Sequence, residues 1–185
     1  MRKLMLLALV ILLLMGLVLA APVAATKGNP DHEVPFKGAF SGVLLGFNED
    51  PDDIAERCFD RPAWAVTSFE GSGTVTHLGK THVIAEHCSY LSGEPLSPDG
   101  TYGEGVLTLT AANGDVLKGT YTNGISTSGP PVIGFMDDFT FVDGGTGRFA
   151  HASGGGVEEG FVDATFGLED APTVWMMKGD ISYHR

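Results

Sequence analysis

Near its carboxyl end the chain reads Trp175-Met-Met-Lys-Gly-Asp-Ile-Ser-Tyr-His184, and the character of the residues alternates along this stretch. One set contains Trp175, Met177, Gly179, Ile181 and Tyr183, and the other contains Lys178, Asp180, Ser182 and His184. Alternate side chains of a β-strand point to opposite faces, so the pattern predicts a strand with one dry and one wet face. A helix would mix the two sets around its circumference.

Seven further stretches show the same two-residue period less cleanly, and Gly, Pro, Asp and Asn separate them. They cover residues 36–47, 64–77, 80–90, 101–112, 115–123, 133–142 and 156–166. Asn113-Gly114 between two of them is a strong hairpin signal, because both residues tolerate positive φ. Short helical turns are expected only over 51–57 and 147–152.

Eight short strands with local connections predict an all-β fold, an eight-stranded antiparallel up-and-down barrel of the calycin-like kind with little helix. Closure into a barrel removes the sheet edges that an open sheet would expose. A sandwich of two sheets would show the same alternation and is the alternative architecture.

The length of 185 residues suits one globular domain. Acidic residues outnumber basic ones 23 to 11, which gives a net charge of −12. Such an acidic protein should repel nucleic acid and anionic lipid headgroups, so neither is expected as a partner.

The first residues have the character of a secretory signal peptide. Arg2 and Lys3 precede an apolar run that ends in small residues around Ala25. We therefore expect a signal peptide over 1–25, a flexible leader over 26–34 and a single barrel domain over 35–185. We therefore expect a secreted or extracytoplasmic protein that has no stable membrane association after the signal peptide is cleaved. The alternative is that the segment stays uncleaved and anchors the protein in a membrane.

The chain has two cysteines, Cys58 and Cys88. In an oxidising compartment an even pair most often forms one disulfide, which we expect here. In an up-and-down barrel both cysteines fall at the same end, so the bridge would tie down the long connection over 48–62.

The interior of an eight-stranded barrel is either filled by side chains or just wide enough for one small ligand. Residues expected to line it are Phe36, Phe40, Phe69, Leu107, Leu109, Tyr121, Phe139, Phe141 and Trp175. Glu104, Asp137 and Glu159 are polar residues at mid-strand positions, and a buried acid among them would be costly and therefore a candidate catalytic group.

The acidic segment 48–56 has two interpretations. Asp50 followed by Pro51 is typical of a helix start, with Asp50 as the N-cap. The same segment carries enough oxygen ligands for calcium, although the spacing is not that of an EF-hand. His77, His82 and His87 do not converge as zinc ligands, and we predict neither a metal nor a cofactor.

Gly145-x-Gly147-x-x-Ala150 fits a loosened dinucleotide fingerprint, but the helix and parallel strand that such a site needs are missing from the pattern. The longer stretch Phe139-Thr-Phe-Val-Asp-Gly-Gly-Thr-Gly-Arg-Phe-Ala150 resembles the GGTG-x-F element of the dirigent proteins. It is also similar to the corresponding turn of the allene oxide cyclase barrels and their bacterial relatives. The resemblance implies an eight-stranded antiparallel barrel in which Gly144, Gly145 and Gly147 form a tight turn and Phe149 plugs the barrel.

The resemblance also implies a small hydrophobic molecule inside the barrel. Dirigent proteins guide the coupling of phenoxy radicals, and the cyclases close an oxidised fatty-acid epoxide. Glu49-Asp50-Pro51-Asp52 resembles part of the acidic motif of dirigent proteins, without the Leu-Thr that follows it there. On this ground Asp50 joins Asp137 and Glu104 as a candidate catalytic residue.

The sequence is therefore compatible with three functions. The first is a secreted barrel that binds a small apolar molecule or serves as a stable extracellular module. The second is an isomerase, cyclase or coupling guide that uses an acid inside the barrel. The third is a structural barrel that associates with itself into a homo-oligomer.

Overall fold

The computed structural model describes residues 33–93 and 95–183. The predicted signal peptide over 1–25 and most of the predicted leader lie outside the described residues. Within the described ranges, no helix is both long and apolar enough to cross a membrane.

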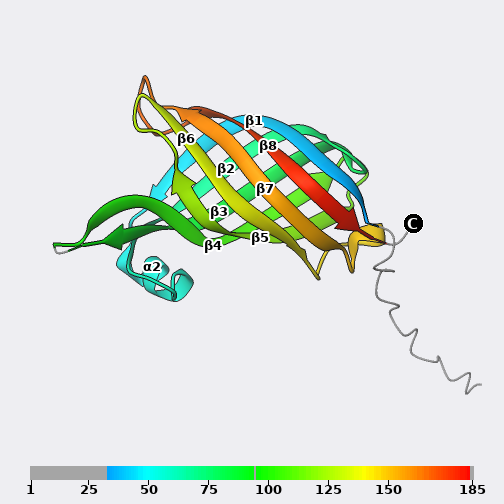
Figure 1. The fold of residues 1–185 in the computed structure, drawn as a ribbon, viewed down its shortest axis with the longest axis horizontal. Helices are drawn as coiled ribbons and strands as arrows, with labels where there is room; N and C mark the ends of the chain where they lie inside the picture. The colour runs from blue at the N-terminus through cyan, green and yellow to red at the C-terminus, as the bar shows by residue number, and fades with distance from the viewer. Residues whose placement is uncertain (1–32, 94, 184–185) are drawn as a thin grey trace, which may run out of the picture.

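Eight antiparallel strands form one closed barrel in which each strand pairs with the next along the chain and the last pairs with the first (Figure 1). The strands are β1 (Val34–Asn48), β2 (Ala63–Val75), β3 (Gly79–Ser92), β4 (Ser97–Ala111), β5 (Val116–Ser126), β6 (Val132–Val142), β7 (Ser153–Asp163) and β8 (Ala171–Ser182). The predicted barrel is thereby confirmed, and the sandwich is wrong, because β8 closes on β1 with Trp175 opposite Phe40.

Two short helices occupy connections at opposite ends of the barrel. Helix α2 (Pro51–Arg57) follows β1, and the 3₁₀ turn η1 (Gly147–Phe149) lies between β6 and β7. Figure 1 shows α2 at one end and the last residues of β8 at the other. The two ends differ in what fills them, and this difference locates the candidate site.

The end of the barrel that carries η1 is packed with side chains. Phe36, Phe139 and Phe149 are almost fully buried there, and Phe36 lies 5.8 Å from Phe139 between ring centroids. Glycines on β7 and β8 let the two backbones approach closely: a Cβ on Gly179 would overlap the carbonyl oxygen of Gly155. The sheet can therefore coil tightly around these aromatic rings.

The glycine-rich turn before η1 has the tight geometry that the resemblance implies. Gly144 and Gly147 have φ of 103° and 55°. A Cβ on Gly145 would lie 2.5 Å from the carbonyl oxygen of Phe149, so this position also has no room for a side chain. Phe149 itself has an exposed fraction of 0% and closes this end of the core.

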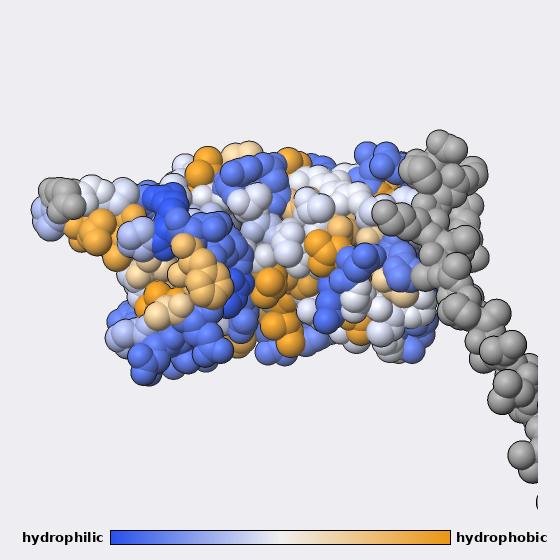
Figure 2. Space-filling model, turned by 90° about the horizontal axis from the view of Figure 1, so that it is seen from below, coloured by the Kyte–Doolittle hydropathy of each residue, from blue (hydrophilic) through white to orange (hydrophobic). Residues whose placement is uncertain are grey.

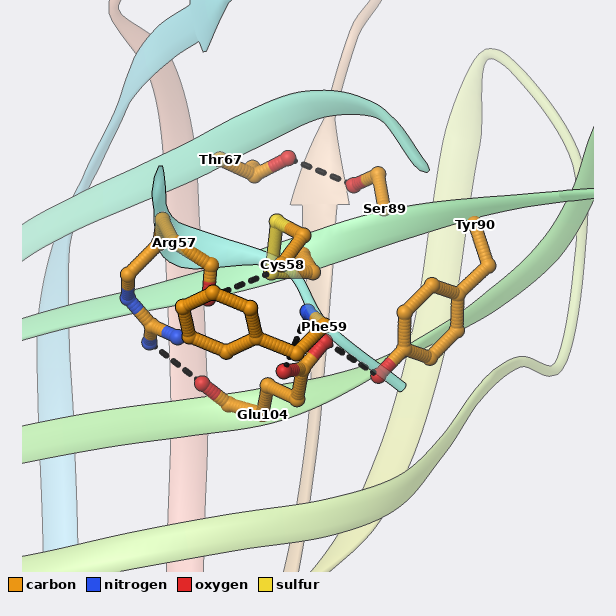
Figure 3. The surroundings of a disulfide bond; sticks show 8 residues. Arg57, Cys58, Phe59, Thr67, Ser89, Tyr90 and Glu104 are labelled. Carbon is orange, nitrogen blue, oxygen red and sulfur yellow. Dashed lines mark hydrogen bonds between the residues drawn. A yellow bond between two sulfur atoms is a disulfide. The ribbon is translucent and has the colours of Figure 1, made fainter. Parts of the chain in front are cut away.

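The predicted disulfide joins Cys58 to Cys88 and fixes the connection after α2 against β3 (Figure 3). Glu104 lies beside the bridge. Its carboxyl group accepts hydrogen bonds from the backbone N–H of Phe59 at 2.7 Å and from the hydroxyl of Tyr90 at 3.3 Å. The loop is thus held by one covalent bond and by a carboxylate of β4.

The acidic segment 48–56 forms the start of α2. Asp50 is the N-cap, because its side chain accepts a hydrogen bond from the backbone N–H of Asp52 at 2.9 Å, and Pro51 begins the helix. Among the described residues, the one group of three potential metal ligands that converges is Cys58, Cys88 and Glu104. The two sulfur atoms of that group are joined to each other, so they are not free thiolates for a metal.

Candidate functional site

The half of the barrel interior nearest α2 is hollow. A cavity of about 250 Å³ lies there, walled by the strand ends that meet at this end of the barrel. Its wall is mainly apolar and includes Leu44, Phe69, Phe135, Val162, Leu168 and Trp175. The sequence was compatible with either a filled or a hollow barrel interior. In the structure one end of the interior is filled by side chains and the other end is hollow.

The nine residues expected to line the interior divide between these two halves. Phe69, Tyr121 and Trp175 border the cavity. The other six belong to the packed core or lie where the core meets the cavity. They are Phe36, Phe40, Leu107, Leu109, Phe139 and Phe141. Phe40 stacks on Trp175 with ring centroids 5.3 Å apart, and this pair marks the boundary between the packed and the hollow halves.

Asp137 on β6 is the one candidate catalytic acid that the structure places in the cavity wall. Its exposed fraction is 4%. One carboxylate oxygen, Oδ2, accepts a hydrogen bond from the hydroxyl of Tyr102 at 2.8 Å. The other oxygen, Oδ1, is buried and has no hydrogen-bond partner among the described residues.

A second acid, Glu158 on β7, lies directly opposite Asp137 in the strand register and borders the same cavity. The sequence pattern did not single out Glu158, and its neighbour Glu159 was the predicted inward acid. Glu159 is exposed on the outside, where Lys178 donates a hydrogen bond to it at 3.1 Å. If the apolar Phe161 faced the interior, two-residue alternation would place Glu159 inside as well, but the side chain of Phe161 lies outside and Val162 is the buried neighbour.

The other two candidate acids do not reach the cavity wall. Glu104 has a φ of 48° at an irregular point of β4, and its side chain turns to the disulfide loop. Asp50 caps α2. Counting back in steps of two from the inward Leu109 and Leu107 places position 104 on the outer face, so strand alternation does not support an inward Glu104.

His87 and two tyrosines form a buried polar cluster beside the acids. The ring of His87 stacks on that of Tyr102 with centroids 4.2 Å apart, and its Nδ1 lies 3.1 Å from the hydroxyl of Tyr121. Thr67 and Ser89 form a further buried hydrogen bond of 2.6 Å at the cavity wall. The cavity therefore has an apolar wall and one polar region.

Burial sets the protonation states of this region. It raises the pKa of Asp137 to about 7, although the hydrogen bond from Tyr102 works in the opposite direction. Burial, followed by repulsion from Asp137, raises the pKa of Glu158 well above its usual range. Burial, helped by the charge of Arg57, lowers the pKa of His87 to about 3. At neutral pH the imidazole is therefore uncharged, and the two carboxyl groups retain at least part of their protons.

These pKa values predict opposite effects of pH on folding. Folded Asp137 holds its proton more tightly than the unfolded chain, so its stabilising contribution is complete below about pH 4 and is lost as the pH rises through about 7. Folded His87 resists protonation, so its contribution is present above about pH 6.5 and is lost as the pH falls towards 3.

We expect two single variants to separate these contributions. Relative to wild type, Asp137→Asn should gain unfolding free energy as the pH rises from 4 to 7, by at most about 4 kcal/mol. His87→Phe should gain it as the pH falls from 6.5 to 4. Urea unfolding at several pH values measures both, and a wild-type pH profile in either variant would contradict the corresponding assignment.

No protein-family model, curated protein or solved structure matches this chain.

Proposed function

We propose that this protein is a secreted binding protein that holds one small, largely apolar molecule in the hollow half of its barrel. The observation that carries the proposal is the cavity of about 250 Å³ with its apolar wall. An engineered cavity of roughly 150 Å³ in another protein is large enough to bind benzene. The present cavity therefore suits a molecule of one or two rings.

The two ends of the barrel support this role differently. The packed aromatic core around Phe139 gives a rigid frame, while the open end is bordered by Phe47 and Trp64, whose ring centroids are 4.9 Å apart. The disulfide fixes the loop next to this open end. Secretion is part of the proposal, since disulfides are typical of oxidising compartments and segment 1–25 has the character of a signal peptide.

Relationship to the allene oxide cyclase and dirigent barrels is also part of the proposal. It is supported by the closed eight-stranded barrel, by the tight turn at Gly144, Gly145 and Gly147, and by the buried Phe149. Fold likeness alone does not assign an activity, so the cavity rather than the kinship supports the binding role.

An isomerase or coupling guide is the second candidate function, and one observation favours it. Asp137 lies in the cavity wall with a pKa raised to about 7, which suits an acid that exchanges protons near neutral pH. Turnover of an epoxide or radical substrate that is lost in Asp137→Asn would establish this activity.

A self-associating structural barrel is the third candidate. Met136, Phe161 and Met176 are exposed on the outside of β6, β7 and β8. On the face shown in Figure 2, by contrast, hydrophobic residues are interspersed with polar ones. A sedimentation-velocity measurement of the oligomeric state tests this candidate directly.

Filling the cavity should abolish binding. Ala85 borders the cavity, so Ala85→Phe places a ring in the space that we assign to the ligand. We expect compounds from a panel of phenolics, terpenoids and short-chain alcohols to raise the melting temperature of wild type but not of Ala85→Phe. Ile84→Phe is the matched control, because Ile84 is the next residue on β3 and is exposed on the outside.

The same experiment can refute the proposal. If no compound in the panel stabilises the wild-type protein, the cavity is not a binding site for apolar molecules. Equal stabilisation of wild type and Ala85→Phe would place binding elsewhere on the protein.

A further inference from the structure

The polar region of the cavity carries acidic groups and no compensating cation. Among the described residues that border the cavity, β6 contributes Asp137 and β7 contributes Glu158, and none is a lysine or arginine. The remaining titratable groups facing these acids are Tyr102 of β4, Tyr121 of β5 and His87 of β3. The cavity residues of β1, β2 and β8 carry no titratable side chain.

The nearby charges outside the cavity do not neutralise the acids. Arg57 donates its hydrogen bond to the backbone carbonyl of Glu104, beside the disulfide loop. Asp138, next to Asp137 on β6, faces outward and raises the pKa of Asp137 further. The imidazole of His87 is uncharged at neutral pH, because burial lowers its pKa to about 3. When these acids ionise, a compensating positive charge must therefore come from another molecule.

Asp137 also presents an unused acceptor. Its side chain is 4% exposed, Oδ2 is occupied by the hydroxyl of Tyr102, and Oδ1 has no partner among the described residues. Buried polar atoms almost always have a hydrogen-bond partner. Since Asp137 borders the cavity, a bound molecule is in a position to supply the missing donor.

The register allows one donor group to meet both acids. Asp137 and Glu158 are directly opposite each other on neighbouring antiparallel strands, where Cβ atoms are about 5 Å apart. An ammonium group has three donors and one positive charge, so it can bridge two carboxylates. A hydroxyl group offers one donor and no charge, and a carboxylate would be repelled.

Aromatic rings surround the same space. Tyr102, Tyr121 and Trp175 border the cavity together with the two acids. Aromatic rings attract cations, and the attraction is largest where water is excluded. The apolar wall formed by Leu44, Phe135 and Val162 then suits an apolar body attached to the charged group.

We propose that the ligand of this cavity is an amine with a small apolar body, and that its ammonium group lies between the carboxyl groups of Asp137 and Glu158. This inference rests on the proposed binding function and specifies its ligand class. The amine binds as a cation, and the proton that the carboxyl pair holds near neutral pH is released to solvent. The negative charge that this proton release leaves on the carboxyl pair offsets the positive charge of the ammonium group, so binding leaves the net charge of the cavity unchanged.

Three probes of matched shape test the inference: 2-phenylethylamine, 2-phenylethanol and 3-phenylpropanoate. We expect isothermal titration calorimetry at pH 7 to give an affinity for the amine that exceeds that for the alcohol by about tenfold or more, with the carboxylate weakest. Titrations in two buffers of different ionisation enthalpy should reveal proton release with the amine alone. The amine should also bind about tenfold or more weakly at pH 5 than at pH 7, because more protons must be displaced.

Variants of the two acids should affect the probes selectively. Asp137→Asn and Glu158→Gln are each expected to weaken amine binding by about tenfold or more, with little effect on the alcohol. Glu159→Gln is the matched control, since Glu159 is the next residue on β7 but faces outward. The pH dependence of wild type keeps the test decisive even if one variant fails to fold.

An amine affinity no higher than that of the alcohol, or an amine affinity that Asp137→Asn and Glu158→Gln leave unchanged, would overturn the inference. Stabilisation by neutral apolar compounds that is lost in Ala85→Phe would still uphold the binding function. If neutral compounds also fail to bind, the binding function falls with the inference.

Discussion

Replacing Phe149 with alanine is expected to lower the free energy of unfolding by about 3 to 5 kcal/mol. The side chain is 0% exposed and closes the packed end of the barrel. Its ring lies 5.2 Å from that of Tyr183 between centroids. Removing the ring deletes buried apolar contacts and leaves a cavity that the coiled strands around it cannot readily fill.

Urea unfolding followed by tryptophan fluorescence measures this loss. Phe166→Ala is the matched control, because Phe166 is fully exposed in the connection between β7 and β8 and should change stability by about 0.5 kcal/mol or less. Phe149→Leu should fall between the two, since it keeps most of the apolar volume. Equal losses in Phe149→Ala and Phe166→Ala would show that the plug does not stabilise the barrel.

Removing the disulfide in Cys58→Ser/Cys88→Ser is expected to cost about 3 to 4 kcal/mol of unfolding free energy. The two cysteines are 30 positions apart, so the bridge closes a long loop in the unfolded chain. It also anchors the segment after α2, where Glu104 holds the backbone N–H of Phe59 (Figure 3). Without the bridge, hydrogen exchange in residues 51–62 should become faster.

Glu104→Gln separates the covalent from the polar contribution. This variant keeps the bridge but weakens the contacts to Phe59 and Tyr90, and it should cost only about 1 kcal/mol. Treating wild type with a reductant should reproduce the double variant. If the double variant matches wild type in urea, the loop is held by its non-covalent contacts instead.

The loop matters for binding because it lies at the open end of the barrel. Phe47 and Trp64, which flank it on β1 and β2, border the cavity. A freed loop would leave these two rings less firmly placed. We therefore expect removal of the disulfide to lower the affinity for the ligand. The Phe149 variants act at the opposite end of the barrel and should lower stability more than ligand affinity.

Local patterns predicted much of this architecture. Alternation in the stretch around Trp175 and Met177 gave the last strand, and Asn113-Gly114 gave one hairpin correctly. The disulfide between Cys58 and Cys88 was predicted because these are the two cysteines of the chain, and the meander order agreed by placing both at the same end of the barrel. Asp50-Pro51 predicted the start of α2, since capping depends on neighbouring residues alone.

The cavity acids were harder to predict. Glu158 and Glu159 are adjacent, so a shift of one residue in strand phase exchanges the inward acid for the outward one. Phe161 suggested the wrong phase, because an apolar side chain on the outside of a barrel resembles a core residue in sequence. The inward prediction for Glu104 was wrong because its position is an odd number of residues from the inward Leu107 and Leu109, and the irregularity of β4 at Glu104 lets Tyr102 face the cavity.

The sequence by itself determined the strands and their meander order, because alternation and turn residues act over a few neighbouring positions, and its two cysteines determined the disulfide that joins the segment after α2 to β3. Only the tertiary structure decided which acid enters the barrel and where the interior is empty. Whether a void forms depends on the total side-chain volume that all eight strands contribute at a given height along the barrel axis. Phe36 and Phe139 fill one end, whereas the small Ala85 and Ser89 leave space at the other. Register, bulges and closure set that sum, and these are properties of the assembled barrel.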